Sequence, residues 1–171
     1  LVVVALPAPS VADSAASINY DFTAALNQLY ASSPAAKKMG SMAKGILVFP
    51  NIVKGGLIIG GQFGEGALRV GGKTKGFYRS VAASYGLQAG IQKFGYALFF
   101  LSDDDLKYLK SSGGWEIGVG PSVVIVDEGM ARSFTTTTAR SGVYAFFFNQ
   151  KGLMAGLGIQ GSKITEIHPG K

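Results

Sequence analysis

Apolar spacing, a proline and a serine cap predict three helices. Between Ser14 and Ser32 they recur every three or four positions and form one stripe. Pro34 suits the first turn of a second helix, roughly Pro34 to Met42. Ser102 can cap a third helix over 102–111, whose first turn, Asp103–Asp105, complements the helix dipole. The first stripe consists of Ile18, Phe22, Ala25, Leu26, Leu29 and Tyr30.

From Gly45 onward, short apolar runs rich in β-branched and aromatic residues alternate with glycine-containing breaks. Such runs predict strands, and nine or ten of them at this spacing predict a closed or nearly closed antiparallel sheet. We therefore expect a strand-rich, barrel-like α+β fold. Asn149–Gly152 is expected to form a hairpin turn. The runs are Ile46–Phe49, Leu57–Phe63, Ala67–Val70, Val81–Gln92, Tyr96–Leu101, Trp115–Val119, Val123–Val126, Ser133–Ala139, Val143–Asn149 and Leu153–Gln160.

The length of 171 residues suits one domain, which we expect over 14–171. Residues 1–13 begin apolar and become rich in small residues, which is typical of a leader remnant and equally of a flexible arm. That apolar run is far shorter than the roughly 20 residues of a membrane-spanning helix. We expect an extracytoplasmic protein, periplasmic or anchored as a lipoprotein, without a transmembrane segment.

Positive charge is concentrated in one third of the chain. Residues 37–93 contain nine Lys or Arg against one Glu, a net +8, whereas residues 1–36 carry −2 and residues 94–171 contain seven of each sign. Such a block favours an acidic partner, and each basic residue near an anionic bilayer contributes about 1 kcal/mol. The predicted binding residues are Lys37, Lys38, Lys44, Lys54, Arg69, Lys73, Lys75, Arg79 and Lys93.

Apolar residues beside these charges could strengthen binding by entering the headgroup region of a bilayer. Core burial is the stronger expectation for Phe49, while Asn51–Lys54 is expected to be an exposed loop. The apolar neighbours are Phe49, Ile52, Val53, Phe77 and Tyr78.

We do not expect catalysis, a metal or a cofactor. The only histidine, His168, is expected in a frayed tail, and there is no cysteine. Neighbouring helical residues such as Asp103–Asp105 point in different directions, which does not suit a metal shell. Gly156–Gly161 matches the spacing of a dinucleotide motif, but only ten residues follow it, too few for the helix and distant acidic residue that such a site requires.

Two groups of glycine-centred motifs make the chain resemble the SYLF domain family over about residues 34–167. The opening group is Ala43–Pro50, Lys54–Gly56, Gly60-Gly61, Gly64, Gly66 and Gly86–Gln92, and the closing group is Tyr144-Ala145 with Asn149–Gly161. The resemblance implies a lipid-binding module: eukaryotic relatives bind phosphoinositides and some regulate actin, and bacterial relatives are commonly exported proteins or lipoproteins. Lys44 and Lys54 match positions where the family usually carries lysine.

The chain also departs from the family. It has Tyr78-Arg79 where relatives often carry Trp-Ser, and Gly120–Val124 where they often carry Gly-Pro-x-Gly-Arg. Headgroup preference is therefore open. Actin binding is not expected, because the chain has no counterpart of the polybasic extension or the Src-homology partner domain of the eukaryotic proteins.

The favoured hypothesis is non-catalytic, peripheral binding of anionic phospholipids, phosphoinositide-like or other, through a basic face. One alternative is a structural or assembly protein of the cell envelope, for which Thr135–Thr138 is a candidate edge strand. Another is a carrier of an apolar ligand inside the barrel, suggested by Phe99-Phe100 and Phe146–Phe148. Nucleic-acid binding is not expected, because no recognition helix or single-strand platform is evident.

Overall fold

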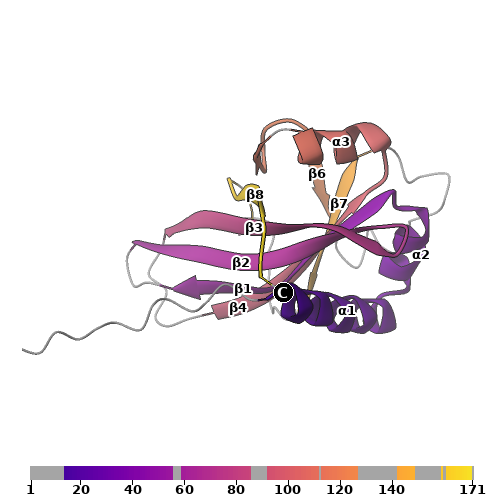
Figure 1. Ribbon diagram of the computed structural model, residues 1–171, viewed down its shortest axis with the longest axis horizontal. Helices are drawn as coiled ribbons and strands as arrows, with labels where there is room; N and C mark the ends of the chain where they lie inside the picture. The colour runs from indigo at the N-terminus through magenta and orange to yellow at the C-terminus, as the bar shows by residue number, and fades with distance from the viewer. Residues whose placement is uncertain are drawn as a thin grey trace, which may run out of the picture.

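The computed structural model describes residues 14–55, 59–85, 92–111, 113–126, 142–148, 159 and 161–170. Two helices precede a curled sheet, and a third helix follows its fourth strand (Figure 1). The elements are α1 (Ala15–Ser32), α2 (Pro34–Met42), β1 (Gly45–Gly55), β2 (Ile59–Val70), β3 (Lys73–Tyr85), β4 (Gln92–Phe100), α3 (Asp103–Ser111), β5 (Trp115–Glu116), β6 (Val123–Ile125), β7 (Val143–Phe148) and β8 (Lys163–Ile167).

The three predicted helices are confirmed, and each begins at a serine cap. Ser14 Oγ accepts a hydrogen bond from the Ser17 amide, and Ser33 Oγ accepts one from the Ala36 amide, each at 3.1 Å. Ser102 Oγ accepts from the Asp105 amide at 3.1 Å. These side chains satisfy amides that the first turn of a helix leaves without backbone partners.

The described strands form one eight-stranded sheet in the order β5-β8-β3-β2-β1-β4-β7-β6. The sheet is an open, strongly curled half-barrel, and β6 pairs with β7 in parallel. The predicted strand-rich α+β class is confirmed, and six of the seven pairings among the described strands are antiparallel. The prediction that the sheet is closed or nearly closed is wrong, and so is the expectation of a purely antiparallel sheet. Apolar runs reveal the existence of strands, but neither their direction nor whether the last strand meets the first.

Individual strands also differ from the predicted runs. The runs at 57–63, described from Ile59 onward, and at 67–70 share the single strand β2, and Asn51–Lys54 is part of β1 instead of an exposed loop. The predicted strand Ser133–Ala139, with its threonine run, and the turn Asn149–Gly152 lie outside the described residues. The same holds for Leu153–Gln160 except for Ile159.

The C-terminal residues are tied to the body of the fold, which corrects the expectation of a frayed tail. Strand β8 pairs with β3, and the Ala15 amide donates a hydrogen bond of 2.7 Å to the Gly170 carbonyl. His168 follows this strand and is exposed. The sequence Lys163–Ile167 is short and half polar, so its pattern did not reveal a strand.

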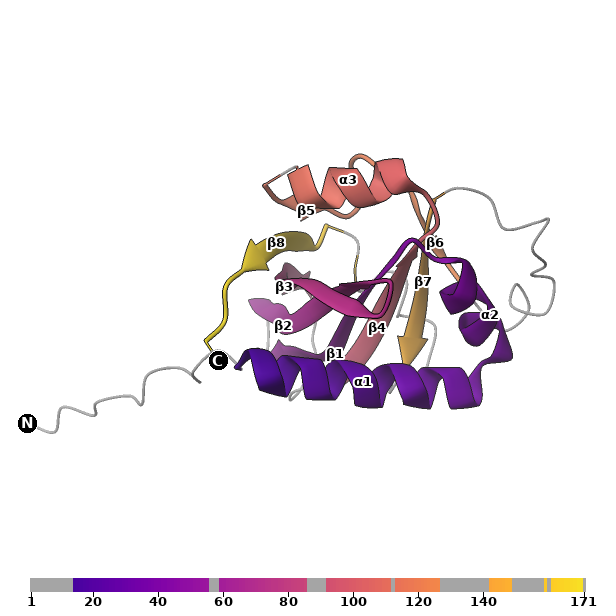
Figure 2. The same cartoon turned by 45° about the vertical axis from the view of Figure 1, so that its right-hand side comes forward.

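Both faces of the sheet are buried over much of their area. Helix α1 crosses one face, and α3 covers the other (Figure 2). Along β4, Ala97 and Phe99 pack toward α1, whereas Tyr96 and Leu98 pack toward α3. This double burial explains why the strands are almost continuously apolar instead of alternating with polar residues.

Glycines allow the sheet to bend at Pro50 and Asn51, where the register of β1 shifts between Phe49 and Ile52. A Cβ added to Gly66 on β2 would collide with the Val48 carbonyl, and one on Gly95 of β4 would lie 2.6 Å from the Pro50 carbonyl oxygen. Only glycine lets the strands on both sides of β1 approach the bend this closely.

Candidate anion-binding surface

Lys73 and Lys75 lie at one end of the sheet, beside the tight turn between β2 and β3. Gly71 and Gly72 form this turn with φ angles of 60° and 79°. Two consecutive positive φ angles are typical of hairpin turns whose twist matches that of the strands. Val70 pairs with Lys73 across the turn, and both lysine side chains are exposed.

Three more exposed lysines reach the same end from the N-terminal side. Lys37 and Lys38 lie on α2, which leads directly into Lys44 and β1. The Lys44 amide donates to the Phe100 carbonyl at 2.7 Å, and the pairing of Ile46 with Arg69 sets the start of β1 beside the end of β2. Helix α2 and the turn lie at the same end of the molecule in Figures 1 and 2.

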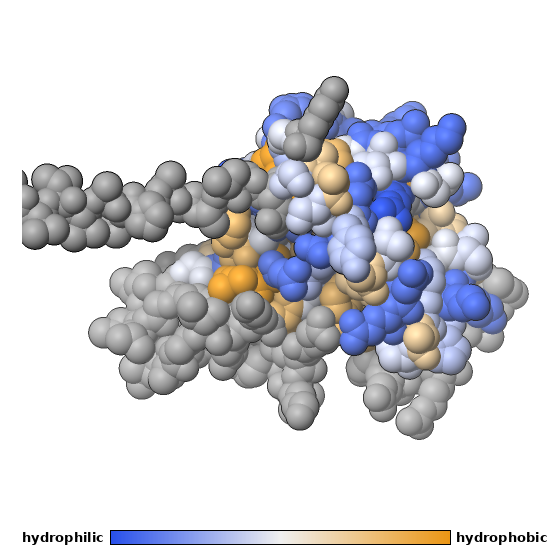
Figure 3. Space-filling model, turned by 60° about the horizontal axis from the view of Figure 1, so that its bottom comes forward, coloured by the Kyte–Doolittle hydropathy of each residue, from blue (hydrophilic) through white to orange (hydrophobic). Residues whose placement is uncertain are grey.

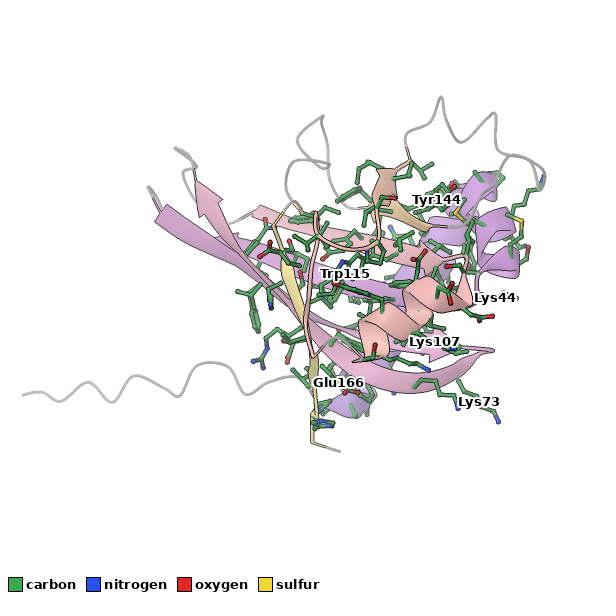
Figure 4. All side chains as sticks on the ribbon, turned by 90° about the horizontal axis from the view of Figure 1, so that it is seen from above. Lys44, Lys73, Lys107, Trp115, Tyr144 and Glu166 are labelled. Carbon is green, nitrogen blue, oxygen red and sulfur yellow. The ribbon has the colours of Figure 1, made fainter. Side chains whose placement is uncertain are left out.

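We call Lys37, Lys38, Lys44, Lys73 and Lys75 the hairpin-end lysines. Helix α3 adds Lys107, which is exposed, and Figure 4 shows Lys44, Lys73 and Lys107 toward the same end of the molecule. Sequence reasoning missed Lys107 because it lies in the electrically balanced third of the chain. The buried stripe of Leu106 and Leu109 was the signal that could have placed it on the exposed side of α3.

This end also carries acidic residues, Asp103–Asp105 in the first turn of α3. Six lysines against three aspartates leave a net charge of +3 for these nine side chains. The local field is therefore positive but smaller than the lysines alone would give.

Arg69, one of the predicted binding residues, instead holds α1 to the sheet. Its Nη2 donates to the Asn19 carbonyl at 3.1 Å and to Thr23 Oγ1 at 2.7 Å, and its guanidinium lies 4.0 Å from the centre of the Phe22 ring. Desolvation by burial lowers the pKa of Arg69. The Arg69 guanidinium is therefore engaged in contacts inside the protein instead of facing a partner.

Arg79 is also committed to a partner in the protein. Its Nη2 lies 3.2 Å from Glu65 Oε2, in a pair where the Glu65 side chain is 3% exposed and that of Arg79 is 38% exposed. The buried carboxylate needs this cation, because an unpaired buried charge is costly. Arg79 therefore does not contribute a free positive charge.

The backbone positions of Lys54 and Lys93 lie at the opposite end of the sheet. Lys44 directly precedes β1 and Lys54 lies near its end, ten residues later, which at 3.3 Å per residue separates them by roughly 30 Å. Lys93 pairs with Val53, next to Lys54. The nine predicted residues therefore do not share one face, and the two lysines transferred from the SYLF resemblance lie at opposite ends.

The apolar residues expected to enter a bilayer lie mainly in the core. Phe49, Ile52 and Tyr78 are 0%, 1% and 3% exposed, and Val53 and Phe77 are partly buried. Burial of Phe49 was the stronger expectation and is confirmed. Insertion of Ile52 and Tyr78 is excluded in this fold, because β1 continues through its bend at Ile52, and Tyr78 on β3 faces the same buried cluster.

Polar chemistry in the core is sparse. Tyr96 is fully buried and shares a hydrogen bond of 2.8 Å with Ser80 Oγ. Burial raises the pKa of Tyr96, and the bond to Ser80 opposes this only in part. Across the parts of the chain that the structure describes, no group of three or more His, Asp or Glu could hold a metal ion.

No helix within the described ranges combines the length and the apolar character needed to span a membrane. Comparison with models of known protein families finds no match, and comparison with curated proteins finds none either. The resemblance to the SYLF family thus stays a prediction that depends on the motifs quoted above.

Proposed function

We propose that the protein binds anionic phospholipid surfaces peripherally and without catalysis, through the hairpin-end lysines. The observation that carries this proposal is the gathering of five exposed lysines, from α2, the start of β1 and the β2–β3 hairpin, at one end of the sheet. The SYLF resemblance supports the same function independently of this geometry, and it supports an extracytoplasmic or lipoprotein location.

Binding through this surface is expected to be electrostatic and reversible. Five lysines at about 1 kcal/mol each give useful affinity for an anionic bilayer. The nearby Asp103–Asp105 reduce this attraction, and salt screens it over about 8 Å at physiological ionic strength. Of the apolar residues predicted to insert, Phe49, Ile52 and Tyr78 are buried, so we expect affinity to depend mainly on charge and to fall steeply as salt rises.

Co-sedimentation with vesicles tests the proposal. We expect binding at low salt to vesicles of phosphatidylcholine mixed with phosphatidylglycerol, and none to phosphatidylcholine alone. The double substitution Lys73→Glu and Lys75→Glu should weaken binding by about 30-fold or more, since two lost lysines correspond to about 2 kcal/mol.

The matched control is Lys54→Glu with Lys93→Glu, which changes the net charge equally at the opposite end of the sheet. Binding by this control should stay within about threefold of the native chain, because both positions lie farther than a Debye length from the hairpin-end lysines. Equal losses in both double variants, or equal binding to neutral and anionic vesicles, would refute the hairpin-end surface.

The carrier hypothesis has less support. The concave side of the half-barrel is filled by packed aromatic side chains, among them Tyr96, Phe100 and Trp115, which are each at most 1% exposed. An apolar ligand would have to displace these contacts.

A further inference from the structure

No further inference is drawn: the strongest candidate, the exposed apolar patch of Phe63 and Val81 on the face of the sheet that α1 crosses (Figure 3), carries no proposal, because nothing in the structure shows what covers it.

Discussion

Residues of the same charge have three different roles in this protein. Arg69 is bound to α1, Arg79 neutralises a buried carboxylate, and lysines such as Lys73 extend into solvent. In the sequence all nine basic residues belong to one block. The register of β2 and β3 separates them, because it decides which side chain meets α1, which meets Glu65 and which lies beside the turn.

The Arg69 contacts can be tested by the conservative change Arg69→Lys. Lysine keeps the charge but lacks the planar guanidinium group. That group donates hydrogen bonds to Asn19 and Thr23 and stacks on the Phe22 ring. We expect the free energy of unfolding to fall by about 1–2 kcal/mol. Amide hydrogen exchange should accelerate more in α1 than in β4. Lys73→Arg, at an exposed position, is the control; equal effects of the two changes would contradict the assigned role.

A pH dependence follows from Tyr78. Burial, followed by the nearby Glu166 carboxylate, raises the pKa of Tyr78 to about 12. The unfolded chain ionises near pH 10, so the phenol contributes its full stabilisation below pH 10 and loses it as the pH rises through about 12. Tyr78→Phe should therefore make the alkaline decline in unfolding free energy shallower, by about 3 kcal/mol at most. Denaturant unfolding at several alkaline pH values measures this, and identical slopes would exclude it.

At the scale of elements, local patterns determined what could be predicted. Apolar residues at three- to four-residue spacing predicted α1, Pro34 predicted α2, and the Ser102 cap with its acidic first turn predicted α3, all with nearly correct bounds. The parallel pairing of β6 with β7 and the strand β8 were missed. Both depend on contacts between segments distant in the sequence, which hydrophobic periodicity does not encode.

The bend of β1 depends on the glycines facing it, which Gly66→Ala tests. The new methyl group would collide with the Val48 carbonyl, so we expect a loss of at least about 3 kcal/mol or failure to fold. Gly61→Ala is the matched control on the same strand, because its Cβ would lie 3.7 Å from the nearest atom, the Ala82 carbonyl oxygen. Thermal unfolding compares the two; similar melting temperatures would show that the close approach is not required.

At the scale of the whole molecule, the sequence shows where along the chain the basic residues lie but not how they are distributed over the surface. Lys37, Lys38 and Lys44 follow one another closely in the chain, and a turn at Gly71-Gly72 makes Lys73 and Lys75 neighbours of that group. Because β1 is long, Lys54 lies too far from these lysines to share a surface with them.

The most direct test of the central claim is to determine which end of the molecule meets an anionic bilayer. The chain has no cysteine, so Ser41→Cys on α2 and Glu116→Cys on β5 each provide a single site for a nitroxide label, and both positions are exposed. Electron paramagnetic resonance with phosphatidylglycerol-containing vesicles should show immobilisation of the label and protection from a water-soluble relaxation agent at Ser41 but not at Glu116. Protection at Glu116 alone, or at neither position while the protein is bound, would contradict a membrane surface built from the hairpin-end lysines.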